Sequence, residues 1–323
     1  MRVLVTGIDG FVGPWAAAAL RAAGHEVHGL VRRPPSPRLV ALGLPPQALH
    51  TGDVTDPARL AEVLGAAAPD AVLHLASVAF VPAAERDPFT AYRTNVLGTL
   101  AVLSSVRAQA PRSRVLVVTS GDVYGDPRPE DLPLTEDAPL RPRSVYGASK
   151  AAADVTAAQW ARAYGLDVVR ARPFNHTGPG QDAAYVCSAL ARQLAAIEAG
   201  RQDAVLRVGN VDPVRDFSDV RDVAAGYVAL LERGQTGEAY NLCAGEGISV
   251  AEVIALLRAR ARVPVRVHSD PALRRTNDPP RIVGSHARAT AHTGWTPSIP
   301  FADTLAALLD DFRSRPETSS RVV

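Results

Sequence analysis

The sequence predicts an α/β protein with a doubly wound parallel sheet and a smaller C-terminal lobe. Short runs of β-branched and other apolar residues alternate with alanine-rich stretches that have helical periodicity. Strands that are apolar on both faces are typical of a parallel sheet covered by helices on each side. With 323 residues, the chain is long enough for one large domain or two smaller ones. The expected strands of the sheet span residues 2–7, 26–32, 71–77, 114–120 and 166–173.

The pattern changes after about residue 173. Loops rich in Gly, Pro and Asp then separate shorter helices and strands, which is typical of a lobe that recognises a ligand through its loops. We expect the helix at 219–234 and the strand at 240–244 to return to the main sheet. Residues 1–173 are therefore assigned to the main domain, 174–315 mainly to the lobe, and 316–323 to a frayed tail.

Composition and charge exclude several classes of function. The formal net charge is +2 and basic residues form no long run, so neither nucleic acid nor an anionic membrane is an expected partner. Cys187 and Cys243 lie outside any CxxC motif or His cluster, which predicts neither a disulfide framework nor a metal site. The first strand begins at residue 2, and no apolar run approaches the ~20 residues of a membrane span. We expect a cytoplasmic protein.

The segment TGIDGFVG, residues 6–13, follows the first strand and places glycine at 7, 10 and 13. Glycines here allow a tight turn, close approach of backbone N–H groups to a pyrophosphate, and close packing of the next helix on the strand. The GxxGxxG spacing departs from the commoner GxGxxG fingerprint, so the interpretation depends on the strand and helix that flank the turn. This context indicates a dinucleotide cofactor.

The end of the second strand bears on the kind of cofactor. An acidic residue at this point accepts hydrogen bonds from the ribose hydroxyls in most NAD sites. This chain has Arg32 and Arg33 there instead, and an arginine can neutralise a 2′-phosphate. The sequence therefore favours NADP(H), with NAD(H) as a further possibility. The alternative is that the two arginines only open a solvated loop.

Lys150 is the only lysine of the chain; the other 34 of the 35 basic residues are arginine. It follows Tyr146 by four residues in an alanine-rich segment, so on a helix both side chains lie on one face. A compact ammonium can approach a phenol and a sugar hydroxyl together, whereas a planar guanidinium cannot. A nearby cation also lowers the pKa of a phenol, which suits a general acid. A solvated helix face is the alternative.

Ser120 is the last residue of the strand expected at 114–120, at the edge where open α/β sheets place their ligand sites. Its hydroxyl can donate a hydrogen bond to a substrate carbonyl oxygen while Tyr146 supplies a proton. These three residues, Ser120, Tyr146 and Lys150, are the predicted catalytic group. A serine that only caps a strand end is the alternative interpretation of Ser120.

Six motifs in this order resemble the extended short-chain dehydrogenase/reductase family over nearly the whole chain: TGIDGFVG, GDVTD around Asp53, HLAS, NVLGT, VVTSGDVYG and YGASK. In the second half, ARPFNHTGPGQ, VGNVDPVRDFSDVRDV, DPALRRTND and GSHARATAHTGW are similar to the GDP-6-deoxy-D-mannose reductases of that family, relatives of the GDP-mannose 4,6-dehydratases. The resemblance implies a Rossmann domain, a nucleotide-sugar substrate and a homodimer formed by helices near 86–109 and 146–163.

The resemblance also implies roles for individual residues. The cofactor would contact Gly7, Gly10, Phe11, Val12, Gly13, Arg32, Asp53, Val54, Leu75, Ala76, Ser77, Asn95, Tyr146 and Lys150. Lys150 would hold the nicotinamide ribose. The nucleotide-diphosphate part of the substrate would contact Asn175, Arg215, Arg274 and Arg275, because arginine binds a diphosphate bidentately. The alternative role for Arg215 is a structural salt bridge. His176 is expected to shape its loop rather than transfer protons.

The expected function is NADP(H)-dependent reduction of GDP-4-keto-6-deoxy-D-mannose to GDP-D-rhamnose. The alternatives are a nucleotide-sugar 4,6-dehydratase or 4-epimerase and, from another class, a non-enzymatic Rossmann binding protein, which would not need Tyr146 and Lys150. Related dehydratases carry a glutamate two residues after the catalytic Ser or Thr, where this chain has Asp122. A carboxylate that is one methylene shorter favours the reductase.

Overall fold

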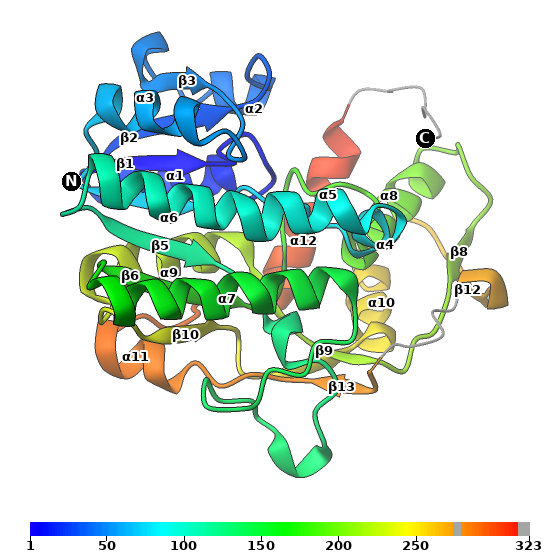
Figure 1. Ribbon diagram of the computed structural model, residues 1–323. Coiled ribbons are helices and arrows are strands. Elements are labelled where there is room, and N and C mark those ends of the chain that lie inside the picture. Colours follow the sequence, from blue (N-terminus) through cyan, green and yellow to red (C-terminus); the bar gives the residue numbers. More distant parts are fainter. Residues whose placement is uncertain (274–278, 316–323) are drawn as a thin grey trace.

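The computed structural model describes residues 1–273 and 279–315, and a seven-stranded parallel sheet forms its centre (Figure 1). The strand order is β10-β6-β5-β4-β1-β2-β3, and every neighbouring pair is parallel. The predicted fold class is confirmed. The strands are β1 (Arg2–Thr6), β2 (Glu26–Val31), β3 (Leu49–Thr51), β4 (Ala71–His74), β5 (Arg114–Val118), β6 (Val168–Pro173) and β10 (Ala239–Leu242).

Helices cover both faces of this sheet, as in a doubly wound fold. One face packs on α1 (Gly13–Ala22), α9 (Val220–Arg233) and α11 (Ala287–Thr293). The other packs on α3 (Pro57–Ala67), α6 (Gly98–Gln109) and α7 (Val145–Tyr164). Figure 1 shows α6 and α7 side by side in front of the sheet. Valine, leucine and alanine side chains dominate both interfaces, which accounts for the apolar strands of the sequence.

The five predicted strands are present, each with its carboxyl end one to three residues earlier than predicted, except β6. Strand β3 was not predicted, because it is only three residues long and none of its side chains is buried. Strand β10 extends the sheet beside β6, and α9 packs on β5 and β6. The boundary at residue 173 stays a proposal, and the expected tail at 316–323 lies outside the described residues.

The smaller lobe lies beyond the carboxyl ends of the main strands, at the right of Figure 1. Its core is formed by α8 (Val186–Glu198), α10 (Val250–Arg258) and α12 (Phe301–Ser314). One lobe sheet contains β9 (Val214–Asp219) between β11 (Gly247–Ser249) and β13 (Arg281–Ile282), with β7 (Asn175–Thr177) also paired to β9. A second sheet pairs β8 (Val205–Val208) with β12 (Arg266–Ser269).

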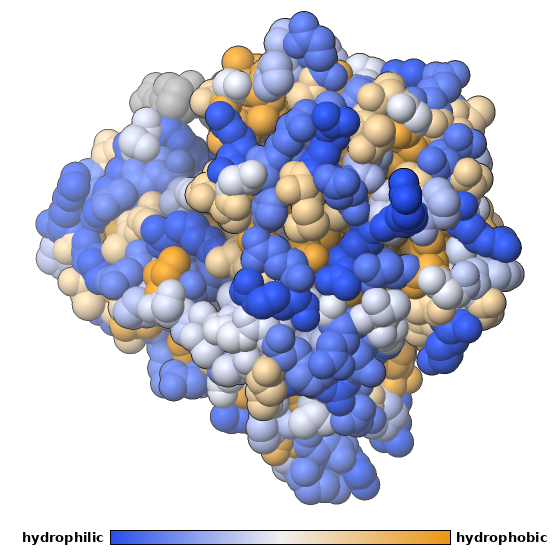
Figure 2. Space-filling view, turned by 90° about the vertical axis from the view of Figure 1, so that its left-hand side faces the viewer, coloured by the Kyte–Doolittle hydropathy of each residue, from blue (hydrophilic) through white to orange (hydrophobic). Residues whose placement is uncertain are grey.

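Short helices connect these elements. They are α2 (Pro37–Val40), α4 (Val81–Arg86), α5 (Pro88–Tyr92), the π-turn η2 (Arg93–Leu97), and the 3₁₀ turns η1 (Pro46–Ala48), η3 (Gly121–Tyr124), η4 (Pro129–Asp131) and η5 (Pro271–Leu273). On the face shown in Figure 2, hydrophilic residues dominate and hydrophobic ones are scattered. No helix within residues 1–273 and 279–315 is both long and apolar enough to cross a membrane.

A buried ionic cluster fixes α7 against the sheet. The side chain of Asp154 on α7 is 1% exposed and accepts hydrogen bonds from Arg170 and Arg172 of β6 at 2.6 to 2.9 Å. Thr119, which follows β5, donates a further hydrogen bond to the same carboxylate. Arg172 also donates to the Tyr124 hydroxyl. Because the two cations and the carboxylate are away from water, each depends on the others to remain buried.

We therefore expect Asp154→Asn to lower the free energy of unfolding by about 3–5 kcal/mol, since it leaves two buried guanidinium groups without their anion. Urea unfolding followed by circular dichroism measures the change. Glu62→Gln is the control, because Glu62 pairs with Arg59 at the exposed surface, where an ion pair contributes about 0–1 kcal/mol. Equal unfolding midpoints for Asp154→Asn and the wild type would show that the cluster does not hold α7 in place.

Candidate functional site

A cleft of about 1060 Å³ follows the carboxyl ends of β1, β2, β4, β5 and β6, where the sheet meets the lobe. This edge is where open α/β sheets bind ligands. Sixteen of the predicted site residues line it: Gly7, Gly10, Phe11, Val12, Gly13, Arg32, Asp53, Val54, Leu75, Ala76, Ser77, Ser120, Tyr146, Lys150, Asn175 and Arg215. The fold thus brings together residues that are up to 208 positions apart, from Gly7 to Arg215.

The glycine turn after β1 has no room for side chains at two of its three glycines. Gly7 has φ +70°, and a Cβ there would lie 2.7 Å from the backbone nitrogen of Ala76. A Cβ on Gly13 would lie 2.0 Å from the carbonyl oxygen of Ile8. Gly10 is less constrained, with 3.2 Å to the nearest oxygen. The turn and the first residue of α1 therefore present backbone rather than side chains to the cleft, which suits a phosphate group.

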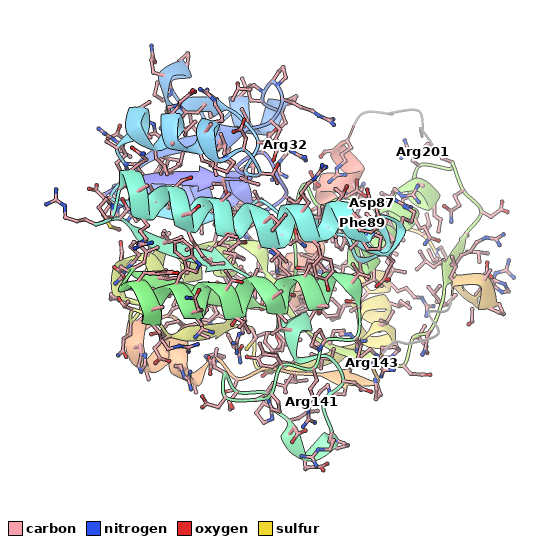
Figure 3. All side chains as sticks on the ribbon, viewed as in Figure 1. Arg32, Asp87, Phe89, Arg141, Arg143 and Arg201 are labelled. Atoms are coloured by element: carbon pink, nitrogen blue, oxygen red, sulfur yellow. The ribbon has the colours of Figure 1, made fainter. Side chains whose placement is uncertain are left out.

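The loop after β2 forms one end of the cleft, where Arg32 is labelled in Figure 3. The Arg32 side chain is 71% exposed, and its Nη1 atom lies 3.9 Å from Asp53. Burial raises the pKa of Asp53, but hydrogen bonds from Thr55 and the charge of Arg32 lower it overall. Asp9 of the glycine turn accepts a hydrogen bond from the Ser36 backbone N–H at 3.0 Å. This bond connects the loop after β2 to the glycine turn.

The three predicted catalytic residues lie together at the middle of the cleft. Ser120 follows β5, and its Oγ accepts a hydrogen bond from the Asp122 backbone at 3.1 Å. Tyr146 and Lys150 lie on the first two turns of α7. Ser144 precedes this helix, and its hydroxyl accepts a hydrogen bond from the backbone N–H of Gly147 at 2.9 Å. The Lys150 Nζ donates to the carbonyl oxygen of Val118 at 2.9 Å and is buried.

Burial dominates the protonation of this group. It lowers the pKa of Lys150 to about 7. Burial also raises the pKa of Tyr146 well above its usual value, the charge of Asp122 raises it further, and a hydrogen bond with Ser120 acts in the opposite direction. The pKa of Tyr146 therefore rises where we expected a nearby cation to lower it, because burial is the largest cause of the shift and Lys150 is not among its causes. The phenol is protonated at neutral pH, which is the form that donates a proton.

Asn95 does not line the cleft. It is buried in the π-turn η2, where its side-chain amide accepts from the Val78 backbone at 2.8 Å and donates to the Ser149 hydroxyl at 2.9 Å. The Ser149 hydroxyl in turn donates to the carbonyl oxygen of Tyr146. Asn95 therefore supports the loop after β4 and the first turn of α7 from behind, rather than facing a ligand.

A second cavity of about 660 Å³ continues from the cleft into the lobe between α8, β8 and β9. Five residues line both cavities: Asn175, His176, Gln181, Tyr185 and Arg215. Arg215 donates to the carbonyl oxygen of Val214 at 2.8 Å. The predicted substrate residues Arg274 and Arg275 lie outside the described residues. The shared lining makes the two cavities parts of one site.

His176 contacts its own loop and the glycine turn. Its Nδ1 atom is 2.8 Å from the carbonyl oxygen of Phe174, so this nitrogen carries the hydrogen. Its ring is stacked on Phe11 of the glycine turn, with 6.2 Å between ring centroids. Burial lowers its pKa, which favours the neutral ring. A role in proton transfer has no support in these contacts.

Sequence reasoning missed several residues that line the cleft, among them Phe80, Arg143 and Tyr185. Arg143 precedes α7, forms an ion pair with Asp126 and is labelled in Figure 3. None of the three belongs to a motif in the sequence, and each lies on a loop or at a helix start that only the fold brings to the cleft. Within the described residues, no group of three or more His, Cys, Asp or Glu side chains could hold a metal ion.

Comparison with known proteins agrees with this geometry. The family model described as GDP-mannose 4,6 dehydratase matches residues 4–308. The GDP-6-deoxy-D-mannose reductase of Pseudomonas aeruginosa is 40% identical over 314 residues, which cover 97% of this chain and 98% of that protein. The UDP-glucose 4-epimerase of Streptomyces lividans is 33% identical and covers 92% of each chain.

Two solved structures show the same fold. The structure of RMD from Pseudomonas aeruginosa complexed with NADPH has a TM-score of 0.86 and 38% identity, with 98% of each chain covered. The UDP-glucose 4-epimerase of Thermus thermophilus in complex with NAD has a TM-score of 0.86 and 31% identity, with coverage of 97% and 99%. The chain therefore belongs to the NAD-dependent epimerase/dehydratase family, the extended short-chain dehydrogenases/reductases.

Proposed function

We propose that this protein is an NADP(H)-dependent reductase that converts GDP-4-keto-6-deoxy-D-mannose to GDP-D-rhamnose. The observation that carries the proposal is the position of Ser120, Tyr146 and Lys150 in a cleft that continues into a second cavity. One space suits a dinucleotide and the other a nucleotide sugar. The similarity to the Pseudomonas aeruginosa reductase supports the choice of GDP and of the 6-deoxyhexose.

The residues of the cleft fit a dinucleotide. Gly7, Gly10 and Gly13 leave backbone N–H groups free of side-chain cover for a pyrophosphate, while Asp53 and Val54 would flank the adenine. Leu75, Ala76 and Ser77 would lie beside the rest of the cofactor. When bound, the nicotinamide ring supplies the hydride. Arg32 at the end of β2, where an acid would select NAD, supports NADP(H), although NAD(H) is also compatible.

The catalytic residues supply the proton. The Ser120 hydroxyl donates a hydrogen bond to the C4 carbonyl oxygen, on which negative charge develops as hydride reaches the carbon. Tyr146 transfers its phenolic proton to that oxygen, so the ketone gains one hydride and one proton and becomes an alcohol. Lys150 lies one helical turn after Tyr146, donates a hydrogen bond to the Val118 carbonyl oxygen and would contact the nicotinamide ribose.

The second cavity would hold the nucleoside diphosphate of the substrate. Asn175 and Arg215 line both cavities where they meet, which supports a contact with the diphosphate while the hexose reaches Tyr146. Arginine suits this role because its planar fork binds phosphate oxygens bidentately. Arg274 and Arg275 remain proposed contacts of the same group.

The expected homodimer also remains a proposal. Apolar side chains on the outer surface of α5, η2 and α7 support it. Phe89, labelled in Figure 3, is 90% exposed, and Leu97 and Val155 are each 55% exposed. Large exposed apolar side chains that gather on neighbouring helices mark protein interfaces.

Product analysis tests the reductase against the dehydratase alternative. We expect the purified protein to oxidise one NADPH per molecule of GDP-4-keto-6-deoxy-D-mannose and not to dehydrate GDP-mannose at a comparable rate. A panel of GDP- and dTDP-linked 4-keto sugars, offered with NADPH or NADH and analysed by chromatography, measures both. Asp122→Asn should retain substantial reductase activity, because reduction needs no base at that position.

The same variant has a pH signature. The negative charge of Asp122 raises the pKa of Tyr146, so its removal lowers that pKa. The phenol then loses its proton at a lower pH, and the alkaline limb of the kcat profile should shift to lower pH. Efficient formation of the 4-keto product from GDP-mannose by the wild type, abolished in Asp122→Asn, would overturn the reductase in favour of the dehydratase.

Lys150→Arg should reduce kcat by ~10²-fold although it preserves the charge. Lys150 is 5% exposed, and its ammonium lies 2.9 Å from the carbonyl oxygen of Val118. A larger planar guanidinium therefore either loses this hydrogen bond or shifts the first turns of α7. Steady-state turnover measures the loss. Arg162→Lys, an exposed exchange on the same helix, is the matched control and should retain full activity. Near wild-type turnover in Lys150→Arg would show that only the charge matters.

Arg32→Ala should raise the KM for NADPH by about 10-fold and leave the KM for NADH nearly unchanged, because the lost hydrogen bond is to a 2′-phosphate that only NADPH carries. Initial rates with each cofactor at saturating sugar nucleotide give the two constants. Arg112→Ala, exposed and outside the cleft, controls for the general loss of a cation. Equal changes with both cofactors would mean that Arg32 does not read the 2′-phosphate.

A further inference from the structure

Tyr185 lies where the cofactor cleft meets the second cavity and lines both. It is the residue before α8, so it belongs to the lobe. Its ring packs edge-to-face on Phe80, the residue before α4 on the sheet side of the cleft, with ring centroids 5.5 Å apart and an interplanar angle of 66°. Such aromatic pairs contribute about 0.5–1.5 kcal/mol beyond their buried area. The pair therefore joins the two walls of the site.

The backbone of Tyr185 is fixed independently of this contact. Its carbonyl oxygen accepts the first helical hydrogen bond of α8 from Ala189 at 2.7 Å, and its N–H donates to the Asp182 carbonyl at 3.3 Å. The side chain is half-buried. With the backbone held by the helix start and the ring held by Phe80, the phenol has little freedom to swing away from the site.

The Tyr185 hydroxyl is available to a ligand. Within residues 1–273 and 279–315 it has no hydrogen-bond partner. Burial, with a smaller contribution from the charge of Asp182, raises its pKa, so the group is a donor at neutral pH. Tyr146 and Tyr185 both line the cofactor cleft, so the two phenols face the same space. A half-buried hydroxyl without a partner gains most from a polar ligand atom.

We propose that Tyr185 is a substrate-positioning residue whose hydroxyl donates a hydrogen bond to a hydroxyl oxygen of the hexose, while Phe80 holds its ring in place. The inference rests on the proposed reductase function. Ser120 and Tyr146 contact the carbonyl oxygen, and the second cavity holds the nucleotide. Those two anchors leave the tilt of the hexose ring undetermined, and a contact from the lobe wall at the junction fixes it.

Three variants test the proposal. Tyr185→Phe removes the hydroxyl and keeps the ring, Phe80→Leu removes the aromatic support, and Tyr164→Phe is the matched control, because Tyr164 lies exposed at the far end of α7. For each, we would measure kcat and KM for the 4-keto sugar nucleotide, KM for NADPH, the inhibition constant of GDP, and the melting temperature. GDP carries the diphosphate without the hexose, so it separates a sugar contact from a phosphate contact.

We expect Tyr185→Phe to raise the KM for the sugar nucleotide by ~3- to 10-fold, the effect of one neutral hydrogen bond. The inhibition constant of GDP, the KM for NADPH and the melting temperature should not change. Phe80→Leu should raise the same KM, and the double variant should lose less than the two single effects combined, since both act through one contact. Tyr164→Phe should match the wild type.

Two kinetic outcomes overturn the proposal. Wild-type kinetics in Tyr185→Phe would show that the hydroxyl makes no contact in the complex. An equal weakening of GDP inhibition and of the sugar-nucleotide KM would place the hydroxyl on the diphosphate instead. If the wild type reduces no 4-keto sugar, the proposed function fails instead. Calorimetric binding of GDP-mannose to the wild type and to Tyr185→Phe then decides the role of Tyr185, and equal affinities overturn it.

Discussion

The geometry of the candidate site depends on one buried ionic cluster. Asp154 of α7 neutralises Arg170 and Arg172 of β6 and accepts a hydrogen bond from Thr119 after β5. Lys150 lies one helical turn before Asp154, so the cluster that holds the helix also determines where the ammonium lies relative to the strand ends. A buried cluster of this kind requires complementary charges in one arrangement, because an unpaired charge in the interior is costly.

Burial also determines the protonation of Lys150 and Tyr146. Lys150 lies in a buried position and contacts a carbonyl oxygen, so its pKa falls to about 7. The pKa of Tyr146 rises for the same reason, and Asp122 adds to the effect. A lysine tolerates such a position better than an arginine, whose guanidinium stays charged under all conditions. The single lysine of the chain thus lies at a buried place where a compact ammonium contacts a backbone carbonyl oxygen.

The fold and much of the candidate site could be predicted from the sequence. Strong local signals marked the glycine turn, the buried strands and the Tyr146–Lys150 spacing, and each depends on residues that are close in the chain. Asn95 was assigned to the cofactor because its motif is recognisable, whereas the fold buries it behind the cleft. Phe80 and Tyr185 carried no signal, since their importance comes from facing each other across 105 residues of chain.

By itself, the sequence determined the class of sheet, the glycine turn and the family, because periodicity, glycine sterics and ordered motifs are properties of short segments. Only the tertiary structure decided how the two walls of the site meet. It also decided which side chains have pKa values shifted by burial. The joining of the cleft to the second cavity through Asn175, Tyr185 and Arg215 depends on the packing of the lobe against the strand ends. The pKa values of Lys150 and Tyr146 follow from desolvation, which is a property of the folded chain and not of any segment.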